Sequence, residues 1–132
     1  MEINRRTLLA GTASLATLPC IGGAAMAGQV AKGEVPDEAV TLVVTFKAKP
    51  GEEDSVKADL LTLVEPTRKE PGCLCYNLHQ SKTDKSQFLF YEQWADQKSL
   101  DTHSNTPRLK AIVEKLKGRV EASTFTSFEL LK

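Results

Sequence analysis

The chain has 132 residues, with 17 Lys and Arg against 17 Asp and Glu, and 41% of its residues are hydrophobic. That length allows one ordinary domain and argues against an enzyme with a separate cofactor module. The balanced charge supplies no field to attract phosphates, so we expect no nucleic-acid partner. Three cysteines are too few for a disulfide scaffold or a four-ligand zinc site.

The first 27 residues have the features of an export signal. The pair Arg5-Arg6 stands directly before an apolar run, Leu8–Ile21, that is short of the roughly 20 residues needed to cross a bilayer. Small residues follow, and Ala25-x-Ala27 fits the rule for signal peptidase cleavage. We therefore expect a Tat-type signal that is cut after Ala27, and a periplasmic or secreted mature protein.

Two alternatives to the Tat route are a Sec-type signal that carries two arginines and a lipoprotein anchor at Cys20. Cleavage at the expected site leaves a net charge of −1, because the signal contains two arginines and one glutamate. Residues 28–38 contain glycine and proline but no apolar period, which indicates a linker. We expect one folded domain over residues 39–132, with no membrane contact after the signal is removed.

The first half of this domain predicts a strand and a helix. Residues 40–47 are rich in β-branched side chains and stop at Lys49-Pro50-Gly51, which indicates a strand followed by a turn. Apolar residues from Val56 to Val64 then recur at spacings of three and four, which is typical of one face of a helix. Pro66 is expected to kink or end this helix, because proline cannot donate to the helical hydrogen bonds.

The second half predicts a hairpin, two short helices and a last strand. Strands are expected at 73–79 and 87–94, joined by a wholly polar turn at 81–86. Asp96 is a candidate cap for a short helix, and Thr106-Pro107 has the residues that begin another. The second of these helices is expected to end at Gly118, and the last strand is expected at 123–131.

The predicted order, βαβ-βαβ with a divided second helix, is that of a ferredoxin-like α+β fold. Such a fold has an antiparallel four-stranded sheet with helices on one face. All eight aromatic residues fall in the predicted strands, on both faces of the sheet. A face with many apolar side chains is not expected to remain in water. We therefore expect a homodimer in which Val43, Leu89 and Tyr91 meet a second copy.

Three segments of the chain, in this order, resemble the antibiotic biosynthesis monooxygenase family. They are Glu70-Pro71-Gly72-Cys73-Leu74-x-Tyr76, Phe88-x-x-Tyr91-Glu92-x-Trp94 and Leu100-x-x-His103. The resemblance covers roughly residues 40–131 and implies a dimeric α+β barrel. Several family members oxidise quinols or polyphenols with O2 and no bound metal or flavin. Others degrade haem, process autoinducers or have no assigned activity.

The resemblance favours a cofactor-independent monooxygenase that acts on a small electron-rich quinol or phenol. The partners it implies are a small aromatic substrate and O2, with no metal or other cofactor. The alternatives are a non-catalytic small-molecule binding or stress-response protein of the same fold and an isomerase-like variant. Haem degradation is disfavoured, because Val44 stands where that branch has an asparagine and its histidine is missing from Pro107–Lys117.

Candidate site residues follow from the face that each strand turns to the helices. The period of two puts Phe90, Glu92 and Trp94 on one face, where burial would raise the pKa of Glu92 towards that of a general base. His103, on the helix that follows, could accept a proton near neutral pH. We expect Glu92 and His103 as catalytic residues and Trp94, Val44 and Phe90 as substrate-binding residues. Structural roles in the core or in ion pairs are the alternatives.

Cys73 and Cys75, two positions apart on a strand, are expected to point to one face. Two unbridged, buried thiols are the favoured state of this pair. A strained disulfide between them and a metal site completed by His79 are the alternatives. His79 itself, at a strand end beside the polar turn, is expected to be exposed.

Overall fold

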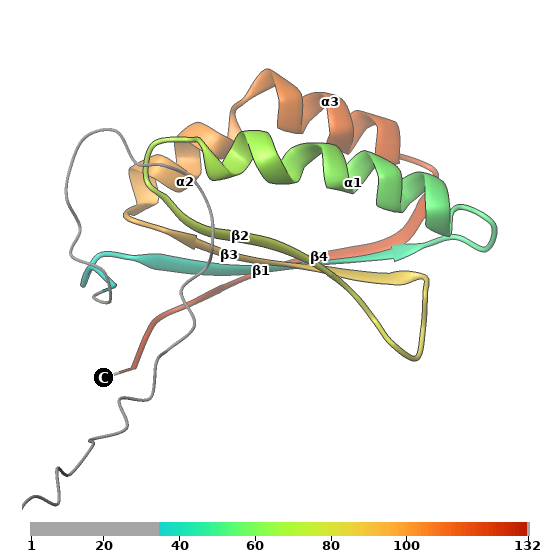
Figure 1. The fold of residues 1–132 in the computed structure, drawn as a ribbon, viewed down its shortest axis with the longest axis horizontal. Helices are drawn as coiled ribbons and strands as arrows, with labels where there is room; N and C mark the ends of the chain where they lie inside the picture. The colour runs from blue at the N-terminus through green and yellow to red at the C-terminus, as the bar shows by residue number, and fades with distance from the viewer. Residues whose placement is uncertain (1–34, 132) are drawn as a thin grey trace, which may run out of the picture.

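Within residues 35–131, four strands form one antiparallel sheet, and three helices lie on one of its faces (Figure 1). The computed structural model describes residues 35–131. Its elements are β1 (Val40–Ala48), α1 (Glu53–Arg68), β2 (Cys73–Gln80), β3 (Gln87–Trp94), α2 (Gln97–Ser104), α3 (Pro107–Leu116) and β4 (Val120–Phe128). The strand order β2-β3-β1-β4 is the ferredoxin-like order, so the predicted α+β fold is confirmed.

The core lies between the helices and one sheet face. Alternate residues of β1 and β3 point into it, and all eight aromatic residues lie in strands as predicted. The apolar stripe of α1 covers this face. The fully or nearly fully buried apolar side chains of the core include Val44, Val56, Leu60, Leu63, Tyr76, Phe88, Phe90 and Trp94.

Helix α1 continues for two residues past Pro66 and ends at Arg68, so Pro66 does not end it. The proline lies in the last turn, where its missing N–H removes one helical hydrogen bond. Lys69 then closes the helix by donating to the carbonyl oxygens of Pro66 and Thr67. A proline at this place therefore weakens one turn without breaking the helix.

Strand β4 runs three residues earlier than predicted, over Val120–Phe128 instead of 123–131. Its register explains the difference, because Val120 pairs with Ala48 and Phe128 pairs with Thr41, near the two ends of β1. A strand is ordered only as far as its neighbour offers backbone partners. Leu130 and Leu131 therefore lie outside the sheet and are exposed.

The two cysteines of β2 point to opposite faces, so the prediction that they share one face is wrong. Cys73 lies opposite Trp94 and Cys75 opposite Gln93, with a register shift between the two cysteines. Such a bulge places one extra residue on one strand and reverses the alternation. Cys73 is a free thiol that packs against the core, and burial raises its pKa to about 12. Neither a Cys73–Cys75 disulfide nor the metal set with His79 is compatible with this geometry. The prediction of two unbridged thiols is also wrong, because Cys75 is disulfide-bonded whereas Cys73 is free.

The starts of α2 and α3 are capped as predicted. The Asp96 side chain accepts a hydrogen bond from the Ser99 amide at 2.7 Å, and the Thr106 hydroxyl accepts one from the Leu109 amide at 3.3 Å. These caps satisfy amide groups that have no partner inside the helix. They fix where α2 begins, and α2 carries His103.

The sheet face opposite the helices carries Val43, Leu89 and Tyr91; Val43 pairs with Tyr91, and Leu89 pairs with Thr45 on the same face. This is the face that we expect to meet a second copy. Within residues 35–131, no helix has both the length and the apolar character needed to cross a bilayer. The predicted export signal and most of the predicted linker lie outside the described residues.

Candidate functional site

A small cavity lies between the sheet and the two short helices, with a volume of about 80 Å³. Most of its wall is apolar. The lining residues are Leu42, Val44, Phe46, Leu63, Tyr76, Phe90, Glu92, Leu100, His103, Ser104, Leu109, Val113 and Phe125. Val113 and Phe125 are exposed, so the cavity reaches the surface beside α3 and β4. An apolar pocket with few polar groups is the usual form of a small-molecule site.

Glu92 brings a carboxyl group to this cavity from the centre of β3. The residue is only 3% exposed, and its Oε2 accepts a hydrogen bond of 3.0 Å from Nε1 of Trp94. Burial raises the pKa of Glu92 to about 7, although the Trp94 hydrogen bond acts in the opposite direction. Near neutral pH this carboxyl group can therefore either donate or accept a proton.

His103 faces the same cavity from α2 and is also 3% exposed. Its Nδ1 lies 2.8 Å from Oε2 of Glu70. Burial lowers the pKa of His103, and this effect outweighs the opposite effect of the Glu70 carboxylate. A neutral imidazole is therefore favoured at neutral pH, which is the form that can accept a proton.

Glu70 connects α3 to this histidine. It lies in the turn between α1 and β2, and its side chain is 15% exposed. While Oε2 contacts His103, Oε1 accepts a hydrogen bond of 2.6 Å from Nη2 of Arg108. One carboxylate thus joins residues of two helices beside the cavity.

Aromatic rings hold the histidine from two sides. The ring of Trp94 lies against that of His103 with centroids 4.6 Å apart and 30° between the planes. Tyr76 meets His103 edge to face, with centroids 5.4 Å apart. Burial raises the pKa of Tyr76 far above its usual value, so its hydroxyl group remains protonated. These contacts leave the imidazole ring little freedom to rotate.

A family model described as "Antibiotic biosynthesis monooxygenase" matches residues 39–115. The chain belongs to this family. The match includes the cavity residues from Leu42 to Val113 and both ionisable groups, Glu92 and His103. It confirms the resemblance inferred from the three sequence segments, and with it the assignment to monooxygenase-like proteins.

The chain is also similar to individual curated proteins, one of which is named as a monooxygenase. An uncharacterised protein of Synechocystis is 35% identical over 79 residues, which are 60% of this chain and 54% of that protein. A Mycobacterium tuberculosis protein named "Putative monooxygenase" is 29% identical over 68 residues, 52% of this chain and 66% of its own length. This chain therefore spans about half to two thirds of the length of these two relatives.

A solved structure from Pseudomonas aeruginosa has the same fold. It is 31% identical to this chain and has a TM-score of 0.70. The superposed region covers 76% of this chain and 100% of the other. The family fold therefore accounts for nearly all of the sheet and helices described above.

Four of the five predicted site residues of this family member line the cavity: Glu92, His103, Val44 and Phe90. Trp94 is not on the cavity wall. It is fully buried behind the wall, where it contacts both Glu92 and His103. The structure thus gives Trp94 the position of a supporting residue instead of a substrate contact.

Sequence reasoning did not assign Glu70, Tyr76 and Arg108 to the site. Glu70 and Tyr76 were part of the segments that carry the family resemblance, so the signal was present without a role. Arg108 gave no signal, because an arginine in the first turn of a helix is common on protein surfaces. Arg108 belongs to the site only through its hydrogen bond to Glu70, which lies 38 positions earlier in the chain.

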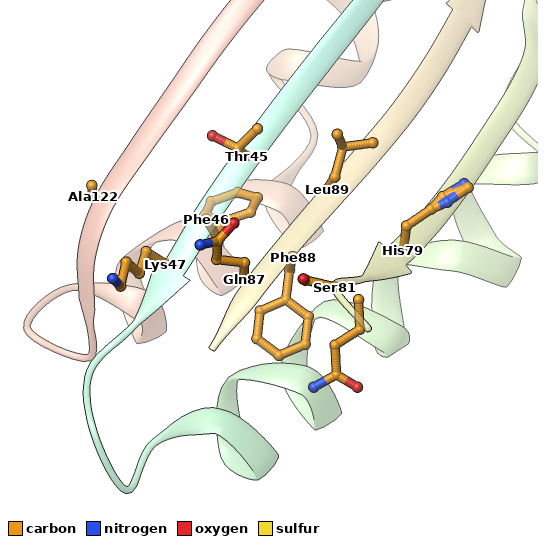
Figure 2. Close-up of a pocket in the computed structure, with 10 residues that line it drawn as sticks. Thr45, Phe46, Lys47, His79, Ser81, Gln87, Phe88, Leu89 and Ala122 are labelled. Carbon is orange, nitrogen blue, oxygen red and sulfur yellow. The ribbon is translucent and has the colours of Figure 1, made fainter. Parts of the chain in front are cut away.

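A second hollow of about 350 Å³ lies at one end of the sheet (Figure 2). Thr45, His79 and Leu89 line it from three neighbouring strands, and Lys47 lies at its edge. By register these side chains point away from the helices, so this hollow is on the opposite side of the sheet from Glu92 and His103. His79 is exposed there, as predicted. Within residues 35–131, no group of three or more His, Cys, Asp or Glu side chains could hold a metal ion.

Proposed function

We propose that this protein is a cofactor-independent monooxygenase that oxidises a small electron-rich quinol or phenol with O2. For a quinol, one oxygen atom enters the ring as a hydroxyl group and the other leaves as water. The quinol becomes a hydroxyquinone, and the substrate supplies all four electrons that reduce O2. The protein then has three tasks: to bind a ring, to remove a hydroxyl proton and to exclude water.

The observation that carries this proposal is the position of two ionisable groups on one apolar cavity. Glu92 and His103 come from β3 and α2, and both line the same space as Val44 and Phe90. The pKa of Glu92 is raised to about 7, and that of His103 is lowered. A base with a pKa near the working pH is the most effective proton acceptor. An electron-rich ring is also compatible with walls formed by aromatic and aliphatic side chains.

The size of the cavity limits the substrate. Its volume of about 80 Å³ is smaller than the roughly 150 Å³ of an engineered cavity that binds benzene. A ring can enter only if the wall moves, and Phe125 is the candidate because it is 65% exposed on the edge strand β4. We therefore expect single-ring quinols to be better substrates than fused-ring ones.

Oxygen consumption tests the proposal. The purified protein is supplied with a panel of hydroquinones under ¹⁸O2, and one labelled oxygen is expected in the product for each O2 consumed. His103→Ala and Glu92→Gln are expected to lower kcat by about 100- to 10,000-fold, the usual loss when a general base is removed. His79→Ala is the matched control, because it removes the other imidazole of the chain and His79 does not line the cavity of Glu92 and His103.

Three outcomes would contradict the proposal. Loss of activity on addition of a chelator would assign the chemistry to a metal. Full activity in both base variants would leave the cavity without a catalytic residue. Saturable binding of quinols to the wild-type protein with no oxygen uptake would instead support a non-catalytic binding protein of the same fold.

A further inference from the structure

We propose that Glu70 is a positioning residue that fixes the tautomer of His103, so that the Nε2 atom of His103 presents its lone pair to the cavity. This inference rests on the proposed function for its catalytic consequence. The tautomer itself is a property of the protein without substrate. It can therefore be tested separately.

The side chains of Glu70 and His103 are in direct contact. Glu70 Oε2 lies 2.8 Å from Nδ1 of His103, and a carboxylate oxygen can only accept a hydrogen bond. Nδ1 must therefore carry the proton. In a neutral imidazole Nε2 is then unprotonated, and His103 is on the wall of the cavity.

The Glu70 carboxylate is held in a fixed position by contacts at both of its oxygens. Its other oxygen accepts the 2.6 Å hydrogen bond from Arg108 in the first turn of α3, so the two oxygens have different partners. The short turn that follows, Pro71-Gly72, leads directly into β2. A carboxylate bound at both oxygens cannot easily rotate away from the imidazole.

Ionisable and charged groups from several elements surround the imidazole ring of His103. Glu70 lies at Nδ1, Arg108 lies behind Glu70, Tyr76 meets the ring from β2, and Glu92 lines the cavity from β3. The Glu70 carboxylate stabilises the imidazolium that forms when Nε2 takes a substrate proton. Arg108 disfavours the same imidazolium, but its effect is the smallest of those that act on the pKa of His103, and it is itself paired with Glu70.

The proton transfer in this scheme is simple. The substrate O–H bond breaks, its electron pair stays on oxygen, and the proton forms a new bond with Nε2. Glu70 keeps its charge throughout and touches neither substrate nor O2. The arrangement is a carboxylate–histidine pair in which the carboxylate orients the base.

The test is a long-range ¹H–¹⁵N correlation spectrum of the full chain labelled with ¹⁵N-histidine, recorded from pH 4.5 to 9. The chain has two histidines, so exposed His79 is an internal reference. In the wild-type protein, His103 is expected to show a protonated Nδ1 and an unprotonated Nε2 at neutral pH. A protonated Nε2 would overturn the proposal, and this result does not depend on any variant.

Glu70→Gln provides the second measurement. Loss of the carboxylate removes the nearby charge that favours the imidazolium, so the titration midpoint of His103 is expected to fall by about 1 unit or more. The amide can also donate to Nδ1, which would move the proton to Nε2. Glu65→Gln is the matched control, since Glu65 contacts Arg68 on the exposed side of α1 and not His103. An unchanged midpoint and tautomer in Glu70→Gln would contradict the inference.

Kinetics then separates this inference from the proposed function. With an active quinol, Glu70→Gln is expected to lower kcat more than it changes KM, and to move the acid limb of the pH profile to lower pH. If the wild-type tautomer is as stated but no quinol is oxidised, the proposed function fails and the positioning role stands. If quinols are oxidised and neither the spectrum nor the profile changes in Glu70→Gln, the positioning role fails alone.

Discussion

Burial, more than any charged neighbour, sets the proton affinity of Glu92. The pKa of this carboxyl group is raised to about 7, and desolvation is the largest cause. The hydrogen bond from Trp94 favours the ionised form but only partly offsets the effect of burial. Glu92 therefore reduces the stability of the folded state at the pH where its chemistry is useful, as is common for groups in functional sites.

This shift predicts a pH-dependent effect of Glu92→Gln on stability. The pKa of Glu92 is about 7 in the folded state and about 4.5 in the unfolded state. The protonated carboxyl group therefore stabilises the fold fully below pH 4.5. This stabilisation is lost as the pH rises through about 7. At pH 8, the ionised and buried Glu92 lowers the free energy of unfolding by about 3 kcal/mol. Glutamine resembles the protonated form, so the variant is expected to raise Tm at pH 8 and to leave it nearly unchanged at pH 4.

Thermal unfolding followed by circular dichroism at several pH values measures this effect. Glu129→Gln is the control, since it makes the same charge change at an exposed residue beyond β4. If Glu92→Gln changed Tm equally at pH 4 and pH 8, burial would not raise the pKa of Glu92.

At the scale of elements, the turn before β2 and the start of α2 depend on one glycine. Gly72 has φ +80°, and a Cβ there would clash with the Ser99 side chain in α2. The carbonyl oxygen of Gly72 also accepts a 2.7 Å hydrogen bond from the Ala95 amide. This close approach connects the Glu70 turn to the helix that carries His103.

Gly72→Ala is therefore expected to destabilise the protein more than Gly51→Ala does. Both glycines have positive φ, which costs an L-residue about 1–2 kcal/mol. At Gly51 nothing lies within 4 Å of the added Cβ, whereas at Gly72 overpacking adds about 1–3 kcal/mol. Urea unfolding measures both variants, and equal losses would mean that the contact with Ser99 contributes nothing.

At the scale of the whole molecule, no helix of residues 35–131 covers the second face of the sheet. Val43, Leu89 and Tyr91 lie on that face at neighbouring positions of β1 and β3. We propose that two copies pack through this face, because it removes these side chains from water. Tyr91→Asp would place a charge in the contact and is expected to give a monomer.

Light scattering at micromolar concentration distinguishes the two states. Ala111→Asp is the matched control, because it adds the same charge at an exposed position of α3. A wild-type protein that remains a monomer would contradict the proposed dimer, and so would a Tyr91→Asp variant that remains a dimer.

Export is the second proposal at this scale. We propose that the mature protein begins near Gly28, after a Tat-type signal that contains Arg5 and Arg6. Intact mass of protein isolated outside the cytoplasm is expected to lack residues 1–27. Replacing both arginines with lysine is expected to block export by the Tat route, whereas continued export would indicate the Sec route. Protein that retains Met1 in the cytoplasm would contradict the proposal.

The element order, the inward faces of β1 and β3 and the caps of α2 and α3 could be predicted from the sequence alone. These features depend on neighbours within a few positions: the alternation that places Glu92 beside Phe90, the helical period of α1, and the side chains of Asp96 and Thr106. Local rules of this kind can be applied to a sequence without a structure.

Other features depend on contacts between elements and could not be predicted from the sequence. His103 and Glu70 are 33 positions apart, and Trp94 proved to be behind the cavity instead of on its wall. Cys73 and Cys75 point to opposite faces of the sheet because of a bulge between them. The extent of β4 depends on the length of β1. Such contacts form between elements that packing brings together. They therefore cannot be predicted from a period or a short motif in the sequence.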